Sequence, residues 1–288
     1  MSVTKAVLCV ARTAGPHWPI QQRQSCALLP LGRTSVLEVL LSELAAAGAS
    51  EICLLIGRND HPVRQHVKSL LADNQLVMAG TIECPDSAPH ITVEYIECEH
   101  EPGLPMARPF VGDEPFMYAT TEMPIYHRRR SGSLLSRMSA AFEATGADGV
   151  LAVNEEAGSG PAGHTLIEAV GDPGASPHFV VANLVDSPLS NGRRINEALI
   201  SRFVLSPIVF DYLDENGFQS DDECDLIAAL RRLAHDRESL WAVRTQSGEV
   251  PFDLSSFLLY SRTFIHFSLE DPEVGTAIRD YISTLATN

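Results

Sequence analysis

The sequence is poor in positive charge. Its 288 residues contain 21 Lys and Arg against 37 Asp and Glu, which gives a formal net charge of −16. Nucleic-acid-binding domains and proteins held on anionic membranes present basic surfaces, so this balance argues against both kinds of partner. No apolar run approaches the ~20 residues of a membrane span, and we expect no signal peptide before the first strand.

The sequence also lacks the cysteine spacing of a zinc site. Its six cysteines are scattered, and none of them forms a C-x-x-C pair. Cys9 and Cys53 fall in predicted buried strands, where a thiol acts as a small hydrophobic group. No internal repeat or low-complexity segment is visible. We therefore expect a protein of the reducing cytoplasm.

The N-terminal stretch has the pattern of an α/β unit. Residues 5–10 and 51–56 are apolar runs typical of strands buried on both faces. Between them, residues 34–48 repeat apolar side chains at helical spacing, with Ser35 placed to cap the helix and Gly48 to end it. In such units ligands bind beyond the carboxyl ends of the strands, so the loop after Val10 is the expected site. A chain of this length and apolar content needs only one large domain.

Periodicity predicts the elements that follow. Apolar residues at helical spacing predict helices over residues 61–78, 134–145, 208–213 and 225–233. Alternating or continuous apolar runs predict strands over 91–96, 117–123, 146–153, 165–170, 178–184 and 240–244. Residues 99–110 contain three prolines and are predicted to be a loop. The basic cluster Tyr126–Arg130 is predicted to be a solvated surface turn.

Short motifs along the chain resemble those of one protein family. They are Lys5-Ala-Val, Val10-Ala11, Leu29-Pro30, Gly57-Arg58-Asn59 and Gly112-Asp-Glu-Pro-Phe116. Together they resemble the bacterial UTP–glucose-1-phosphate uridylyltransferase family over nearly the whole chain. The resemblance implies a doubly wound α/β fold, with a mostly parallel mixed sheet flanked by helices. It also implies a nucleotidyltransferase-like domain over residues 1–270, and a C-terminal helix in 271–288 that packs on it or on a partner subunit.

The motifs with which that family binds phosphates are altered here. Arg12-Thr-Ala-Gly-Pro16 replaces a Gly-rich loop that ends in Thr-Arg, and the large side chain of Arg12 hinders a close approach of the backbone to an anion. The positions at which the family carries a cation hold Pro16, Gln22, Cys26, Ser187 and Phe257. Each lost charge contact costs about 1.5–3 kcal/mol of binding, so we expect no measurable uridylyl transfer.

Other functional positions of the family are kept. The resemblance implies nucleotide- or sugar-binding roles for Ala11, Gly15, Gly103, Asp186 and Asn196. Glu122 and Asp253 fall at the two metal-ligand positions, and carboxylate oxygens suit magnesium. We expect these two residues to lie close together at the carboxyl edge of the sheet. The alternative interpretation of Glu122 is an exposed carboxylate at the end of a strand.

Three functions remain open at this point. In the first, the chain is a catalytically inactive relative. It acts as a regulatory or assembly partner, in a homo-oligomer or in a hetero-oligomer with an active paralogue. Alternatively, the scaffold is repurposed for other chemistry with new groups such as Cys26, His17 or His127, although inert packing is the simpler interpretation of these side chains. The third function is an active sugar-1-phosphate nucleotidyltransferase whose cations come from Arg12, Arg23 and the cluster at 128–130.

The opening loop separates these hypotheses. The expected ligand is a nucleotide or a sugar phosphate, and a site that no longer binds one has nothing to order the loop over residues 12–27. We predict that this loop is mobile or collapsed into the cleft, with Trp18 in the space of a base or a phosphate. An ordered, open pocket lined by His17 or Cys26 would instead indicate a new catalytic site.

Overall fold

The structure is a computed structural model of the whole chain. It describes residues 2–10, 25–58, 60–72, 91–98, 103–128, 133–155, 165–186, 189–190, 193–214, 222–237 and 239–286. The predicted opening loop, with Ala11, Gly15, His17 and Trp18, lies outside these residues except for its last three positions. Among the described residues, no helix has the length and apolar character needed to cross a membrane.

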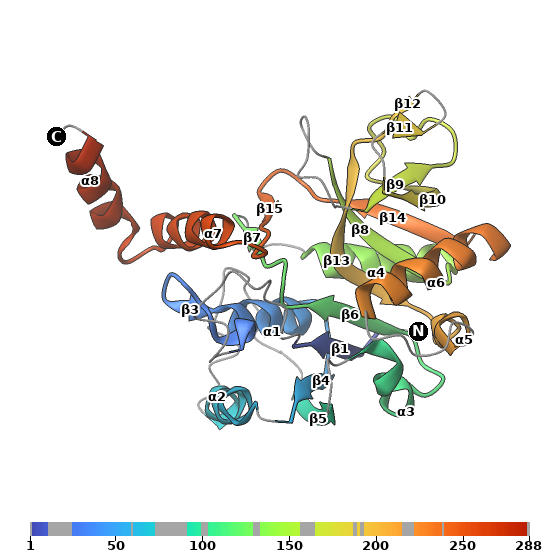
Figure 1. Cartoon of the computed structure of the whole chain (residues 1–288), viewed down its shortest axis with the longest axis horizontal. Coiled ribbons are helices and arrows are strands. Elements are labelled where there is room, and N and C mark those ends of the chain that lie inside the picture. The colour runs from blue at the N-terminus through green and yellow to red at the C-terminus, as the bar shows by residue number, and fades with distance from the viewer. Residues whose placement is uncertain are drawn as a thin grey trace.

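A nine-stranded mixed sheet forms the centre of the molecule (Figure 1). Its strands, in spatial order, are β5 (Thr92–Cys98), β4 (Glu51–Gly57), β1 (Lys5–Cys9), β6 (Phe116–Thr120), β13 (Glu197–Leu205), β8 (Gly149–Glu155), β14 (Leu240–Arg244), β10 (His178–Val185) and β9 (Leu166–Ala169). The strands β5, β4, β1, β6, β8 and β14 point in one direction, and β13 runs against both of its neighbours. The predicted α/β fold is therefore confirmed.

Helices cover both faces of the sheet. One face packs against α1 (Val36–Ala46), α2 (His61–Ala72), α4 (Leu134–Thr145) and α7 (Phe257–Leu269). The other face packs against η3 (Leu104–Ala107), α3 (Arg108–Val111), α5 (Val209–Asp214) and α6 (Asp222–Arg237). The strands are consequently buried on both sides, which explains why β1 and β4 are continuous apolar runs in the sequence.

The helix α1 begins and ends as its sequence predicts. The Ser35 hydroxyl accepts a hydrogen bond from the Glu38 backbone N–H at 3.2 Å, and the Glu38 carboxylate accepts one from the Ser35 N–H at 2.6 Å. These reciprocal bonds form a capping box, which satisfies two free N–H groups of the first turn. Gly48 follows the helix with φ +97°, a conformation that a glycine adopts without strain.

Two local predictions were wrong. Residues 104–111 form the short helices η3 and α3 rather than a loop, because Pro105 and Pro109 lie in the first turn of each helix, where a missing N–H costs nothing. Tyr126 and His127 do not belong to a solvated turn. They lie in the short strand β7 (Ile125–His127), are 7% and 3% exposed, and pair with β15 (Glu249–Pro251).

The last two helices leave the body of the molecule at one end of its longest axis (Figure 1). The helix α7 packs its inner side on the hairpin of β2 (Pro30–Leu31) and β3 (Thr34–Ser35), where the Tyr260 hydroxyl donates to the Pro30 carbonyl at 3.0 Å. The helix α8 (Gly275–Ala286) follows and carries the C-terminus away from the sheet. The remaining small elements are η1 (Cys26–Leu28), β11 (Leu189–Ser190) and β12 (Arg193–Arg194).

Candidate functional site

The carboxyl ends of six strands meet at one edge of the sheet. The pairing of β1 with β6 sets Cys9 beside Thr120, and the pairing of β14 with β8 sets Arg244 beside Val153. The antiparallel strand β13 brings its first residue, Glu197, to the same edge opposite Glu155. This edge is where a doubly wound sheet binds its ligands, and the predicted site after Val10 begins here.

The strand β6 ends at this edge with a buried threonine, Thr120, and a second one, Thr121, follows it. Thr120 is 9% exposed and Thr121 is fully buried. Within the described part of the chain, neither hydroxyl oxygen has a hydrogen-bond partner. A buried polar group without a partner costs about 1–3 kcal/mol, so this end of β6 carries an energetic cost. The sequence analysis did not single out these threonines, because burial of a hydroxyl depends on tertiary packing.

The two predicted metal positions lie on neighbouring segments. The backbone N–H of Leu254 donates to the carbonyl of Glu122 at 3.1 Å, and the next pair of this short ladder joins Phe252 to Pro124 at 2.9 Å. The carboxylate of Asp253 also closes a local turn, because it accepts bonds from the Ser255 N–H at 2.6 Å and from the Ser255 hydroxyl at 2.8 Å.

The described side chains could hold magnesium only together with oxygen atoms from a bound ligand. Among the residues that the structure describes, no group of three or more His, Cys, Asp or Glu side chains is arranged to hold a metal ion. Magnesium in nucleotide-binding proteins uses one or two carboxylates, and phosphate and water oxygens complete its shell. Glu122 and Asp253, whose segments are joined by backbone hydrogen bonds, would each supply one carboxylate to such a shell.

The predicted sugar- and nucleotide-binding residues are spread along the chain. Gly103 is buried and precedes η3. Asn196 is half-buried, and Glu197 directly after it holds Arg244 in a hydrogen bond of 2.7 Å. The carboxylate of Asp186 accepts a bond from Arg231 of α6 at 2.7 Å and is 73% exposed. The carboxylate of Asp186 is therefore already paired with the side chain of Arg231.

Two of the five altered cation positions are described by the structure, and both carry apolar side chains. Cys26 begins η1 and is 4% exposed, within the core that packs on α1. Phe257 begins α7 and is 59% exposed. Pro16, Gln22 and Ser187 lie outside the described residues.

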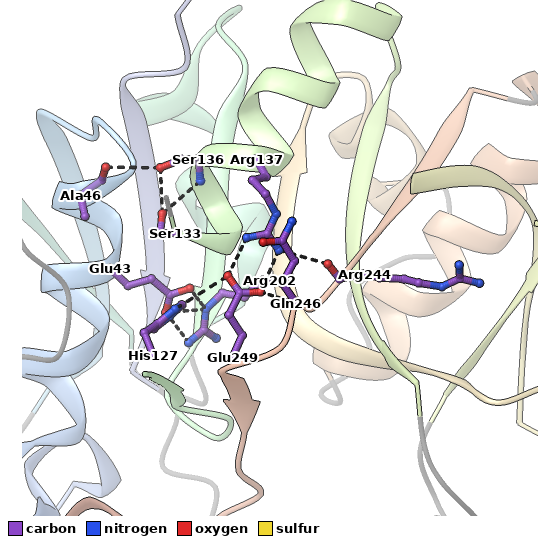
Figure 2. A network of polar contacts seen from close by, with 10 residues as sticks. All are labelled: Glu43, Ala46, His127, Ser133, Ser136, Arg137, Arg202, Arg244, Gln246 and Glu249. Carbon is purple, nitrogen blue, oxygen red and sulfur yellow. Dashed lines mark hydrogen bonds and ion pairs between the residues drawn. The ribbon is translucent and has the colours of Figure 1, made fainter. Parts of the chain in front are cut away.

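A buried polar network lies beneath this edge, between α1, α4, β7, β13 and β15 (Figure 2). Its centre is an ion pair between Arg202 of β13 and Glu43 of α1, both fully buried. The Arg202 Nε lies 3.1 Å from each carboxylate oxygen of Glu43, and Nη2 lies 2.9 Å from Oε2. The remaining Nη1 donates to the Ser201 carbonyl at 3.0 Å. The sequence analysis assigned neither Arg202 nor Glu43 a partner.

A second ion pair lies beside the first. Arg137 of α4 donates to both carboxylate oxygens of Glu249 at 2.6 and 2.7 Å, and to the Arg244 carbonyl at 3.1 Å (Figure 2). Between the two pairs, His127 has Nδ1 3.9 Å from Glu249 Oε1. Burial lowers the pKa of His127, against the raising effect of the carboxylates of Glu43 and Glu249. A neutral imidazole is therefore favoured in this network.

Known proteins resemble this chain over its full length. A UTP–glucose-1-phosphate uridylyltransferase of Staphylococcus epidermidis is 22% identical over 299 residues, which span 98% of each chain. A UTP–glucose-1-phosphate uridylyltransferase 2 of Staphylococcus saprophyticus is 23% identical over 300 residues, which span 99% of each. No family profile matches the chain.

Solved structures show the same fold. A UDP-glucose pyrophosphorylase from Acinetobacter baumannii superposes with a TM-score of 0.78 at 20% identity, over 98% of this chain and 99% of that one. Its UTP-bound form has a TM-score of 0.77 at 20% identity, over 97% and 98% of the two chains. A UDP-glucose pyrophosphorylase complexed with UDP-glucose has a TM-score of 0.71 at 18% identity, over 92% and 97%.

Proposed function

Because this chain is a full-length relative of the bacterial UTP–glucose-1-phosphate uridylyltransferases and has their fold, as its sequence predicted, we propose that it is a catalytically inactive member of that group. It acts as a regulatory or assembly partner rather than as an enzyme. One observation carries this proposal. Every position at which the family places a cation for the phosphates holds Pro, Gln, Cys, Ser or Phe here.

Lysine is scarce in the whole chain. It contains two lysines, Lys5 and Lys68. Lys5 begins β1, and its ammonium donates to the carbonyls of Phe110 and Val111 at 3.1 and 3.2 Å and pairs with Glu114 at 2.6 Å. It therefore lies at the amino edge of the sheet, at the far end of β1 from the candidate site. Lys68 is an exposed residue of α2.

Missing cations affect turnover more than binding. Transfer of a nucleotidyl group develops charge on the phosphate oxygens, and fixed cations stabilise that charge in the transition state. The uncharged part of a nucleotide needs only hydrogen bonds and apolar contacts. The carboxyl edge of the sheet, where β6 ends, is the place at which a doubly wound fold makes such contacts. We accordingly propose that the chain still binds a uridine nucleotide or a nucleotide sugar weakly, without converting it.

Any magnesium at the site depends on Glu122 and Asp253. Because the family's cationic side chains are missing at these positions, a bound divalent ion would supply positive charge to the phosphates. The role of these two carboxylates in this proposal is to hold that ion while the nucleotide supplies further oxygens. The ion gives electrostatic neutralisation of the phosphates when bound.

The alternative of a repurposed enzyme receives little support from the described residues. A catalytic nucleophile or base must reach its substrate. Cys26 and His127 are 4% and 3% exposed, so both are covered by neighbouring side chains. Inert packing, the simpler interpretation from the sequence, agrees with this burial.

Turnover and ligand binding can be tested separately. In the first assay, purified protein receives UTP and glucose 1-phosphate with and without magnesium, and pyrophosphate release is followed. We expect none above a no-enzyme blank, and release that depends on both substrates would refute the proposal. In the second assay, UTP, UDP-glucose and glucose 1-phosphate are screened by thermal shift, because a ligand of the native state raises Tm. A positive shift without turnover supports a regulatory binding site.

A further inference from the structure

The strands β7 and β15 continue into a longer two-stranded ribbon, which we define as residues 122–128 and 248–254. Glu249 lies near the start of its second segment and pairs with the end of β7. Backbone hydrogen bonds carry the ladder on to Leu254, whose N–H donates to the Glu122 carbonyl at 3.1 Å. The two candidate metal positions therefore lie at one end of the ribbon, and Glu249 lies at the other.

The carboxylate of Glu249 is held by two groups outside β7. Arg137 of α4 donates to both of its oxygens at 2.6 and 2.7 Å, and the Gln246 N–H donates to Oε2 at 2.8 Å. The Glu249 side chain is 8% exposed, so solvent screens the ion pair only weakly. Arg137 also donates to the Arg244 carbonyl at the carboxyl end of β14. One guanidinium therefore joins the ribbon to α4 and to the central sheet (Figure 2).

Apolar contacts hold the middle of the ribbon. Ile125 is fully buried, and the rings of Tyr126 and Phe252 lie 5.3 and 5.9 Å from the ring of Phe267 in α7. Apolar contacts are non-directional, whereas an arginine that bonds to both oxygens of a carboxylate fixes the orientation of its partner. We therefore expect the ribbon to stay docked without Arg137, but to lose its fixed orientation.

The ribbon is built to carry a displacement from one end to the other. Glu249 and Asp253 are four residues apart in one segment, which is about 13 Å of extended chain. The ladder bonds of Phe252 and Leu254 join this stretch to the segment that contains Glu122. Paired segments of this kind move together, so a change in orientation at Glu249 displaces both candidate metal positions.

We propose that the ion pair of Arg137 with Glu249 positions Glu122 and Asp253 for the binding of magnesium with a nucleotide. This proposal rests on the proposed function, in which these two carboxylates hold the ion at the phosphates. Arg137 and Glu249 are then positioning residues, which act through the ribbon from its far end. Side chains that orient metal ligands contribute about 10–100-fold to metal affinity. A site with two protein carboxylates depends strongly on such orientation, because displacing one carboxylate removes half of its protein ligands.

The test measures two properties of the variant Arg137→Met. The first is amide hydrogen exchange at Phe252 and Leu254 in the protein without ligand. It should be about 10-fold faster than in the wild type, because the far end of the ribbon opens more readily. The second is the affinity for UTP by calorimetry, with magnesium and with EDTA. The affinity with magnesium should fall at least about 10-fold, and the affinity with EDTA should stay unchanged.

Three further variants separate positioning from general stability. Arg237→Met breaks an ion pair with Asp148 at the amino edge of the sheet and should change neither property. Glu249→Gln should reproduce Arg137→Met, and combining the two should add no further loss, because both act through one pair. Arg137→Lys keeps the charge without the bidentate geometry, so it should restore only part of the affinity with magnesium.

Two results for Arg137→Met would overturn the proposal. They are unchanged exchange at Phe252 and Leu254, and an affinity for UTP with magnesium that equals that of the wild type. Failure of the proposed magnesium site is seen in the wild-type protein alone, which would then bind UTP equally well with magnesium and with EDTA. The two failures are therefore distinguishable.

Discussion

The guanidinium of Arg202, in the central strand β13, forms an ion pair with the carboxylate of Glu43 of α1, 159 positions away in the sequence. Both side chains are completely buried. Such a pair repays the cost of removing two charges from water only while both partners are present. It fixes α1, which follows the loop after Val10 in the chain, to the strand beside β6.

The first prediction concerns this pair. Glu43→Gln leaves the Arg202 charge buried without a counter-ion and should lower the free energy of unfolding by about 3–5 kcal/mol, measured by urea denaturation. The double variant Glu43→Leu/Arg202→Met removes both charges and should recover most of that loss. As a control, Asp211→Asn breaks the exposed pair with Arg108 and should cost at most about 1 kcal/mol. Equal losses for the buried and exposed variants would contradict this account.

The central strand also shows where sequence reasoning stops. β1, α1 and α4 were predicted nearly residue for residue, because each carries its own apolar period or cap. β13 is buried along its whole length but was not predicted, since Glu197, Ser201 and Arg202 interrupt its apolar run. Their burial depends on partners supplied by distant parts of the chain, such as Glu43 and Arg244. A single sequence carries no local signal for such a pairing.

The same limit applies to the candidate site. Its location beyond the carboxyl ends of the strands follows from the α/β pattern alone. The burial of Thr121 could not be predicted, because it depends on how the end of β6 packs. The basic composition of 126–130 predicted a solvated turn, whereas pairing of β7 with β15 turns His127 toward Glu249.

The second prediction concerns the pH dependence of stability. Burial lowers the pKa of His127, and the side chains that face it are Glu43, Glu249, Arg202 and Arg137. As pH falls through the ordinary histidine pKa of about 6.5, the unfolded chain binds a proton that the native chain does not, so stability decreases. The free energy of unfolding keeps decreasing until the pH reaches the lowered pKa that His127 has in the native protein.

The measurement is the free energy of unfolding between pH 7.5 and about 5. The free energy of unfolding of His127→Gln should decrease less steeply over this pH range than that of the wild-type protein. His235→Gln, at a side chain that is 88% exposed, is the control and should follow the wild-type curve. If His127→Gln falls as steeply as the wild type, the imidazole is not held neutral in the native network.

The third prediction concerns thiol reactivity. Burial raises the pKa of Cys53 to about 12, with smaller contributions from Glu94 and Cys98. The thiolate is the reactive form, so Cys53 should resist alkylation by iodoacetamide at pH 8 in the native protein and react fully in denaturant. Mass spectrometry of peptides gives the modified fraction. Rapid native modification of Cys53 would mean that the strand β4 opens far more readily than its burial implies.

The last prediction tests whether Glu122 and Asp253 act together. If magnesium provides the positive charge that the side chains lack, UTP should raise Tm in the presence of magnesium and have a much smaller effect with EDTA. Asp253→Asn and Glu122→Gln should each abolish the magnesium-dependent part of the shift. Asp253→Asn should also lower Tm slightly without any ligand, since its carboxylate accepts two bonds from Ser255. Asp280→Asn, on the distant helix α8, is the matched control for charge and should keep the full shift. A UTP shift that is equally large with EDTA, or one that both site variants retain, would show that the two carboxylates no longer bind a metal.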